Sequence, residues 1–365
     1  MRIRLLQNHI HYHPGLVLHT ASSGAVGHLA ELYLVLEENR QVLGIGEVRE
    51  NIAYLNGLDL EQVRAAVATL LDEIRWEAGP QEIIEDLRSQ TENHPAVARA
   101  LVDSAMHDWW ARQNNLSVSE NLGHSFSPYH GTNQCIFWCS DDHCLEMAQG
   151  YFNRNFKELK LRVGIAEFDR DIKRISMLRQ KLGSGVKLAV DANGVWNHQQ
   201  ALNYIDRLAE LGIAYVEQPI APGDWHKLGD LAEKSPIPIM LDESIASLDD
   251  VKRAVDTHEN LAVHLKIVKI GGITPLLEAA DIINRNQRIL MIGQMNEGSG
   301  ATAAAYQCAI IAKPKYAELY GADGLQDDVL GEIGYEDGKV IIKDRLGIGV
   351  RFNRMPDACL WEKSV

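Results

Sequence analysis

The chain has 365 residues, 46% of them hydrophobic, which is typical of a globular protein with about two domains, or with one large barrel and a smaller domain. With 50 acidic and 36 basic residues it carries a formal net charge of −14, which argues against nucleic acid or an anionic membrane as its main partner. Its first residues contain no apolar signal core, and no apolar run approaches the ~20 residues of a membrane span, so we expect a cytoplasmic protein.

The five cysteines are spaced without any CxxC pair, and they lie at Cys135, Cys139, Cys144, Cys308 and Cys359. An odd number without paired spacing indicates neither a disulfide framework nor a zinc knuckle. We therefore expect reduced, mostly structural thiols.

The first third of the chain changes from strand-like to helical patterns. Up to about residue 60, the runs IRLLQNHIHYH, LAELYLVLEE and QVLGIGEVRE predict a short antiparallel sheet. Residues 60–115 carry apolar side chains at helical spacing. Together they predict an α+β domain over residues 1–125, ending in a segment rich in Gly, Ser, Pro and Asn.

Three histidines on the first predicted strand, His9, His11 and His13, lie at a period of two and share one face. Such a set could bind a metal ion. Because no carboxylate or cysteine lies nearby in the sequence, we interpret it as a solvated strand face.

The middle of the chain alternates strand-like and helical runs. Eight strand-like runs occur, at 135–138, 158–163, 186–192, 214–219, 238–244, 263–269, 289–294 and 317–321. This alternation predicts a parallel (β/α)8-type barrel over residues 126–325. A doubly wound open sheet would usually show a GxGxxG turn after its first strand, and this chain has none. We expect residues 326–365 to return to the N-terminal domain.

Acidic residues close three consecutive barrel strands. Asp191, Glu217 and Asp242 follow one another at intervals of 26 and 25 residues, and Lys266 lies 24 residues further on in the sixth strand. Because these intervals each match one βα unit, we expect the four side chains in one layer at the C-terminal ends of the strands. Three converging carboxylates would repel one another unless a divalent cation neutralised them, and all-oxygen ligands favour Mg²⁺. Helix capping is the alternative role for each acid taken singly.

The second predicted strand, ELKLRVG, carries two cations on one face. Lys160 and Arg162 are two residues apart and so point opposite to Leu159 and Leu161. In an isolated strand this pattern indicates a solvated face, but in a barrel one face points inward. Cations and a metal at such a site would stabilise the enediolate formed when a carboxylate loses its α-proton. We expect neighbouring cations to lower the pKa of Lys266 so that it acts as the general base.

Several motifs in order resemble the enolase superfamily, in its mandelate racemase and muconate lactonizing enzyme group: LKLRVG, VDANG, VEQP, LDES, HLKIVKIGG and GQMNEGSGATAAA, with LVDSAMHDWWARQ before the barrel. The resemblance covers nearly the whole chain. It implies an α+β cap over a modified (β/α)7β barrel, a small-molecule carboxylate substrate and a homo-oligomer.

The same resemblance implies roles for the charged residues. Mg²⁺ would be held by Asp191, Glu217 and Asp242, and Lys266 would be an acid/base on one face of the substrate. A K-x-K pair on the second strand would serve the other face, with Lys160, its first member, helping to bind the substrate carboxylate.

Arg162 departs from that pattern, since it stands where the second lysine is expected. Arginine keeps its proton, so it is a poor general base and a better fixed cation. We therefore expect a one-base dehydratase or a muconate-type cycloisomerase. The alternatives are a racemase or epimerase that uses Arg162 as an unusual second acid/base, and a non-catalytic member of the fold.

Further site residues follow from position. By resemblance, Asn296 and Glu297 at the end of the seventh strand would bind substrate, although Glu297 could instead serve a helix N-terminus. Asn193 lies two residues after Asp191 and Gln218 directly follows Glu217, so each could hydrogen-bond its predicted ligand.

The loop HTASSGAVGH, residues 19–28, lies between two predicted strands of the small domain. The resemblance implies a mobile flap that closes over the substrate, with His19, Thr20 and Ser22 in contact with it. A plain flexible hairpin is the alternative.

Overall fold

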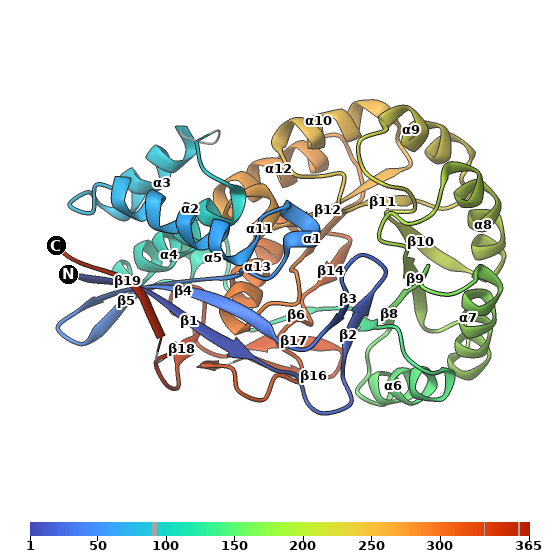
Figure 1. Ribbon diagram of the computed structural model, residues 1–365, viewed down its shortest axis with the longest axis horizontal. Helices are drawn as coiled ribbons and strands as arrows, with labels where there is room; N and C mark the ends of the chain where they lie inside the picture. The colour runs from blue at the N-terminus through green and yellow to red at the C-terminus, as the bar shows by residue number, and fades with distance from the viewer. Residues whose placement is uncertain (90–92, 332, 357) are drawn as a thin grey trace.

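The computed structural model describes residues 1–89, 93–331, 333–356 and 358–365. It confirms the predicted α/β class: an eight-stranded parallel barrel lies beside a sheet of the N-terminal part, with helices covering both (Figure 1). No helix in these ranges combines the length and hydrophobicity needed to cross a membrane.

All eight predicted barrel strands are present. They are β7 (Gln134–Ile136), β8 (Glu158–Arg162), β9 (Lys187–Asp191), β10 (Ile213–Glu217), β11 (Ile239–Leu241), β12 (Leu261–Lys266), β13 (Leu290–Gly293) and β14 (Tyr316–Glu318). They pair in parallel in chain order. The barrel is nearly closed between its end strands, because Asn133 N donates to Ala317 O at 3.0 Å and Leu319 N donates to Thr132 Oγ1 at 2.8 Å.

Helices follow the first seven strands, which is the modified (β/α)7β arrangement, and most of these helices form the outer arc in Figure 1. They are α6 (Asp141–Asn153), α7 (Phe168–Leu182), α8 (His198–Glu210), α9 (Trp225–Lys234), α10 (Leu248–Thr257), α11 (Ile267–Ile270), α12 (Ile273–Arg285) and α13 (Ser299–Ala312). Local sequence sets several of their starts. In α8, for example, Asn197 accepts from Gln200 N while the Gln200 side chain accepts from Asn197 N, a complete capping box.

The cap is built on a four-stranded antiparallel sheet in the order β19 (Ala358–Ser364), β1 (Arg2–Ile10), β4 (Leu29–Glu38) and β5 (Gln41–Arg49). Because β19 pairs with β1, the two ends of the chain lie side by side (Figure 1), and Val365 N donates to Met1 O at 2.9 Å. The domain limits predicted at residues 125 and 325 stay a prediction.

The remaining elements lie outside the barrel sheet and the four-stranded cap sheet. The helices are α1 (Ala53–Asn56), α2 (Leu60–Glu73), α3 (Pro80–Ser89), α4 (Ala96–Gln113) and α5 (Val118–Asn121). The strands are β2 (Leu18–Thr20), β3 (Gly24–Val26), β6 (Tyr129–Gly131), β15 (Leu330–Gly331), β16 (Ile333–Glu336), β17 (Lys339–Ile342) and β18 (Arg351–Phe352).

Helix α4 packs closely on β5 because two glycines leave room for it. A Cβ atom on Gly44 would lie 2.7 Å from Ala105 O, and one on Gly46 would lie 2.1 Å from Leu101 O. Only glycine permits this approach of backbone to backbone. The contact joins the cap sheet to the helix that leads toward the barrel.

Candidate functional site

The interior of the barrel is built in layers two residues apart along each strand. One apolar layer is a cluster of buried side chains, Ala189, Tyr215, Met240, Ala262, Met291 and Tyr316. Because strand side chains alternate, the residue two positions further on each strand also points inward. That next layer consists of Asp191, Glu217, Asp242, His264, Gly293 and Glu318. The three predicted acids therefore converge at the C-terminal ends of the strands, which we call the mouth of the barrel.

His264 and Glu318 belong to this layer although the sequence analysis did not single them out. We expected Lys266 to represent the sixth strand, but the layer has His264 there and Lys266 two residues further along the same face. The regular interval between strand ends predicted Lys266 as the sixth-strand member of the layer. Because neighbouring strands are staggered, the residue that actually lies in the layer is two positions earlier. The same-face pair in VHLK was the available signal for His264, and the strand-ending acid in AELYG was the signal for Glu318.

Glu217 lies at the centre of the layer and is fully buried. Lys160 Nζ donates to its Oε2 at 2.7 Å, and His264 Nδ1 lies 2.8 Å from its Oε1. Burial raises the pKa of Glu217, but Lys160 and His264 more than offset it and hold the pKa well below its usual range. Glu217 is therefore an anion at neutral pH.

Asp242 is held by two lysines. Lys266 Nζ donates to its Oδ2 at 2.6 Å, and Lys269 Nζ donates to both its carboxylate and its backbone carbonyl. Burial opposes the charge, yet these two ammonium groups hold the pKa of Asp242 well below its ordinary value. Lys269 lies in α11, directly after β12, and is buried; it was not among the predicted site residues.

Asp191 is paired with Arg162 instead. Arg162 Nη1 donates to the Asp191 carboxylate, Arg162 Nε donates to Cys135 Sγ at 3.2 Å, and the guanidinium lies 5.8 Å from the centre of the Phe137 ring. Burial disfavours the charge of Arg162, but the surrounding groups hold its pKa well above the ordinary value. Arg162 is a permanent cation here.

Lys160 points its ammonium group at protein carboxylates. Besides Glu217 it pairs with Glu318, and Asp191 Oδ2 lies 3.8 Å away. Burial lowers the pKa of Lys160, but Glu217 and Glu318 outweigh burial and raise it. The fully buried Lys160 balances the excess of negative charge in the layer.

Our prediction that neighbouring cations lower the pKa of Lys266 is wrong for this structure. Burial does lower that pKa, but Asp242, Glu318 and Glu217 outweigh burial and raise it. Lysine neighbours of the same charge contribute less than the carboxylate that Lys266 contacts directly. Asp242 is the carboxylate that contributes most to keeping Lys266 charged in this structure.

One group of side chains in the described part of the chain has the spacing of a metal site. Ligand atoms of Glu217, Asp242 and His264 all lie within 4.8 Å of one another. His264 Nε2 is buried and has no hydrogen-bond partner among the described residues. Two ionised carboxylates and a neutral imidazole are suitable donors for a divalent cation. Asp191, the third predicted ligand, is not part of this group. His9, His11 and His13 form no such group within the described ranges.

The two predicted supporting residues each hydrogen-bond an acid of the layer. Asn193 N donates to Asp191 Oδ1 at 2.8 Å, and its side chain donates to Glu243 at 3.2 Å. The side-chain Oε1 of Gln218 accepts from Asp242 N at 3.1 Å, so Gln218 supports Asp242 and not the adjacent Glu217.

The two predicted substrate-binding residues after β13 are both buried. Glu297 accepts from Met295 N at 3.0 Å and from Arg49 N at 3.4 Å, so its carboxylate faces the cap strand β5. Burial raises the pKa of Glu297. Asn296 Oδ1 has no partner among the residues that the structure describes.

The predicted flap is a hairpin of β2 and β3. His19 and Thr20 lie in β2, and Thr20 Oγ1 lies 3.3 Å from Ser22 Oγ. Trp138 N donates to His19 O at 3.1 Å, which docks the hairpin on the segment after β7. The hairpin thus lies at the mouth of the barrel, and contact with substrate stays a prediction for His19, Thr20 and Ser22.

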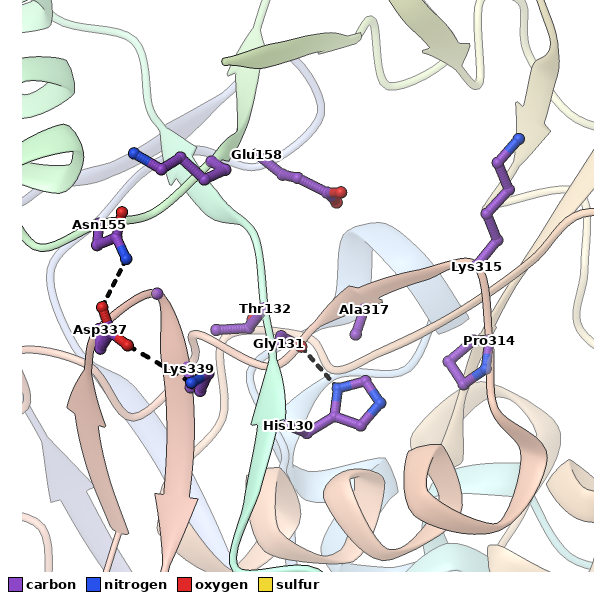
Figure 2. A pocket seen from close by; sticks show the side chains of 12 residues that line it. His130, Gly131, Thr132, Asn155, Glu158, Pro314, Lys315, Ala317, Asp337 and Lys339 are labelled. Atoms are coloured by element: carbon purple, nitrogen blue, oxygen red, sulfur yellow. Dashed lines mark hydrogen bonds and ion pairs between the residues drawn. The ribbon is translucent and has the colours of Figure 1, made fainter. Parts of the chain in front are cut away.

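A cavity of about 380 Å³ lies at the opposite end of the barrel. Figure 2 shows its side chains, including Glu158 at the start of β8 and Lys315 before β14, with Asp337 bound to Asn155 and Lys339. In such barrels the chemistry is located at the C-terminal ends of the strands. This cavity is therefore not the candidate active site.

Comparison with known proteins agrees with this geometry. A model of the family "Enolase C-terminal domain-like" matches residues 143–356. The L-Ala-D/L-Glu epimerase of Bacillus subtilis strain 168 is 30% identical over 284 residues, 75% of each chain. Muconate cycloisomerase 1 of Rhodococcus opacus is 28% identical over 86% of each chain. The structure of the N-succinyl Arg/Lys racemase of Bacillus cereus has a TM-score of 0.89 at 20% identity, covering 100% of this chain and 98% of the other.

The fold and the site define a capped (β/α)7β barrel enzyme with a charged mouth. The chain belongs to the enolase C-terminal domain-like family and is an enzyme of the enolase superfamily, in the mandelate racemase and muconate lactonizing enzyme group. The resemblance noted from the motifs is thereby confirmed.

Proposed function

We propose that this enzyme removes the α-proton of a small carboxylate with one mobile base, Lys266, and that it is a muconate-type cycloisomerase or a dehydratase. The observation that carries the proposal is the state of Arg162, which stays charged and is bound to Asp191 and Cys135. A group that keeps its proton cannot accept one from the second face of the substrate. The similarity to muconate cycloisomerase 1 supports cycloisomerisation.

We infer further that the enzyme uses Mg²⁺, held by Asp191, Glu217 and Asp242. Glu217 and Asp242 are buried and ionised, and hard carboxylate oxygens suit this ion. Bound Mg²⁺ supplies electrostatic stabilisation of the enediolate. His264 would act as a positioning residue, because its Nδ1 contact fixes the orientation of Glu217.

Side chains of this chain carry out the proton transfer and supply the fixed charge. Lys266 in its neutral form takes the α-proton, and the resulting ammonium returns a proton from the same side. Asp242 is the largest contributor to the raised pKa of Lys266, so a cation held by Asp242 would weaken that contribution and would favour the neutral form of Lys266. Lys160 and Arg162 supply fixed positive charge from the opposite strand.

A second candidate function is racemisation or epimerisation, with Arg162 as the other acid/base. It is supported by the similarity to the Bacillus subtilis epimerase and by the placement of basic side chains on two opposite strands. We infer a small-molecule carboxylate as substrate in either case, and a homo-oligomer stays a prediction.

The test is incubation of the protein with Mg²⁺ in D₂O and a panel of muconates, hydroxy acids, N-acyl amino acids and dipeptides, followed by NMR. We expect exchange or product formation on one face, without inversion of the α-carbon. Free inversion by the unmodified enzyme would overturn the one-base proposal. Lys315→Ala, in the distant cavity of Figure 2, is the matched lysine control and should keep full activity.

A further inference from the structure

Two cysteines meet at the start of helix α6, just outside the charged layer. Ser140 caps this helix, since its side chain accepts from His143 N at 3.3 Å and its carbonyl accepts from Cys144 N at 2.9 Å. Cys139 directly precedes the cap and Cys144 is the fourth helical residue. Residues at these two positions pack against each other across a helix start. The cap geometry therefore places the side chains of Cys139 and Cys144 next to each other.

The two thiols differ in exposure and in charge environment. Cys139 is half-buried, whereas Cys144 is buried. Arg174 Nη2 donates to Cys139 O at 3.3 Å and lies 3.8 Å from Cys139 Sγ. The hydrogen bond from Cys144 lowers the pKa of Cys139 to about 7, burial opposes this, and Arg174 and His143 add to the lowering. The same hydrogen bond and burial raise the pKa of Cys144.

We propose that Cys139 and Cys144 are a peroxide-reactive dithiol that closes reversibly to a disulfide. The Cys139 thiolate attacks a hydroperoxide, so that an S–O bond forms, the O–O bond breaks and the alkoxide or hydroxide leaves with a solvent proton. Cys144 then attacks the sulfenic sulfur, an S–S bond forms, the S–O bond breaks and water leaves with the thiol proton. The two sulfurs lose two electrons and the hydroperoxide gains them.

This thiol pair adjoins the predicted flap. Trp138, the residue before Cys139, donates from its backbone to His19 O, and His143 Nε2 lies 3.0 Å from Gly15 O. Arg174 also lies 4.7 Å from the centre of the Trp138 ring, so it contacts both the indole and Cys139. Disulfide formation removes the anion beside Arg174 and alters the segment on which the hairpin docks. Formation of the disulfide would therefore change the packing of the hairpin at the mouth of the barrel.

Peptide mass spectrometry tests the proposal without reference to activity. The full chain is treated with one equivalent of hydrogen peroxide, free thiols are alkylated, and the chain is cut before Asp141 and Asp142, which separate the two cysteines. We expect the two resulting peptides to stay joined, with the loss of two hydrogen atoms, until a reductant is added. Because one of these peptides carries both Cys135 and Cys139, fragmentation of the joined pair should place the link at Cys139. In Cys144→Ser, dimedone should trap a sulfenic acid at Cys139.

Cys359→Ser is the matched control, because Cys359 is exposed and lies far from this pair in the sequence. It should leave formation of the Cys139–Cys144 bond unchanged. Oxidation of Cys359 ahead of Cys139, a disulfide between any other pair, or faster alkylation of Cys144 than of Cys139 would overturn the proposal. Since every readout is a mass, failure of the proposed reaction at the barrel mouth would not affect this test.

Discussion

Strands β8 and β12 lie on opposite sides of the barrel, and each points two basic side chains inward at a spacing of two residues. On β8 these are Lys160 and Arg162, both held charged by carboxylates. On β12 they are His264, whose pKa is lowered by burial and by Lys266, and Lys266 itself. We call Lys160 and Arg162 the β8 wall, and His264 and Lys266 the β12 wall. The two walls have the same spacing of basic side chains but differ in whether these side chains can release a proton.

This difference suggests how one barrel can support different reactions. A wall of permanent cations stabilises an anion but cannot exchange protons with it, whereas a wall with an ammonium group whose counter-ion can be removed can do both. The direction of proton transfer thus depends on which wall holds the titratable group. Substitutions on the two strands should have unequal effects.

Lys266→Ala should have the largest effect on activity, because it removes the proposed base from β12. We expect a roughly 100- to 10,000-fold loss of turnover, the usual contribution of a general base. α-Deuterium exchange in D₂O measures it, with circular dichroism as the check of folding. Lys266→Arg keeps the positive charge and should be equally inactive, so activity in that variant would exclude Lys266 as the base.

His264→Asn tests the other member of the β12 wall. Loss of the ring that contacts Glu217 should weaken Mg²⁺ binding roughly 10- to 100-fold, with less effect at saturating Mg²⁺. Calorimetric titration of the metal-depleted protein measures the affinity. Complete recovery of turnover at high Mg²⁺ would support a positioning role, and an unchanged affinity would contradict it.

Arg162→Lys makes the β8 wall resemble the β12 wall. Loss of a charge-assisted hydrogen bond costs about 1.5–3 kcal/mol, so the native reaction should slow at least ~10-fold. The new lysine should also bring some inversion of the α-carbon, which chiral chromatography detects. If the variant kept every rate unchanged, the proposed role of Arg162 would be wrong.

Arg345→Ala is expected to have the smallest effect, since this ion pair lies outside both walls. Arg345 is 58% exposed and holds the pKa of Glu120 at about 2. A lowered carboxyl pKa stabilises the fold above the usual value near 4.5 and ceases to do so as the pH falls toward 2. We expect a small loss of stability at pH 7 that shrinks on acidification, measured by urea unfolding at several pH values. A loss as large at pH 2 as at pH 7 would contradict the assignment.

Much of the fold was predictable because its signals are local. The helix at 60–73 starts at the capping residue Asp59, and the eight strand runs follow from apolar segments that alternate with helical periods. The predicted convergence of Asp191, Glu217 and Asp242 follows from parallel strands that all end at one mouth.

The barrel, its three central acids and the arginine on its second strand could thus be predicted from local patterns in the sequence. The partners of these groups depend on how the strands pack: His264 lies in the layer of acids, Glu318 lies beside Lys160, and Arg162 pairs with Asp191. Strand packing also decided that the pKa of Lys266 is raised, because the carboxylate responsible comes from a different strand. Periodicity shows which way a side chain points, but strand stagger and the contents of the barrel determine which charge it meets.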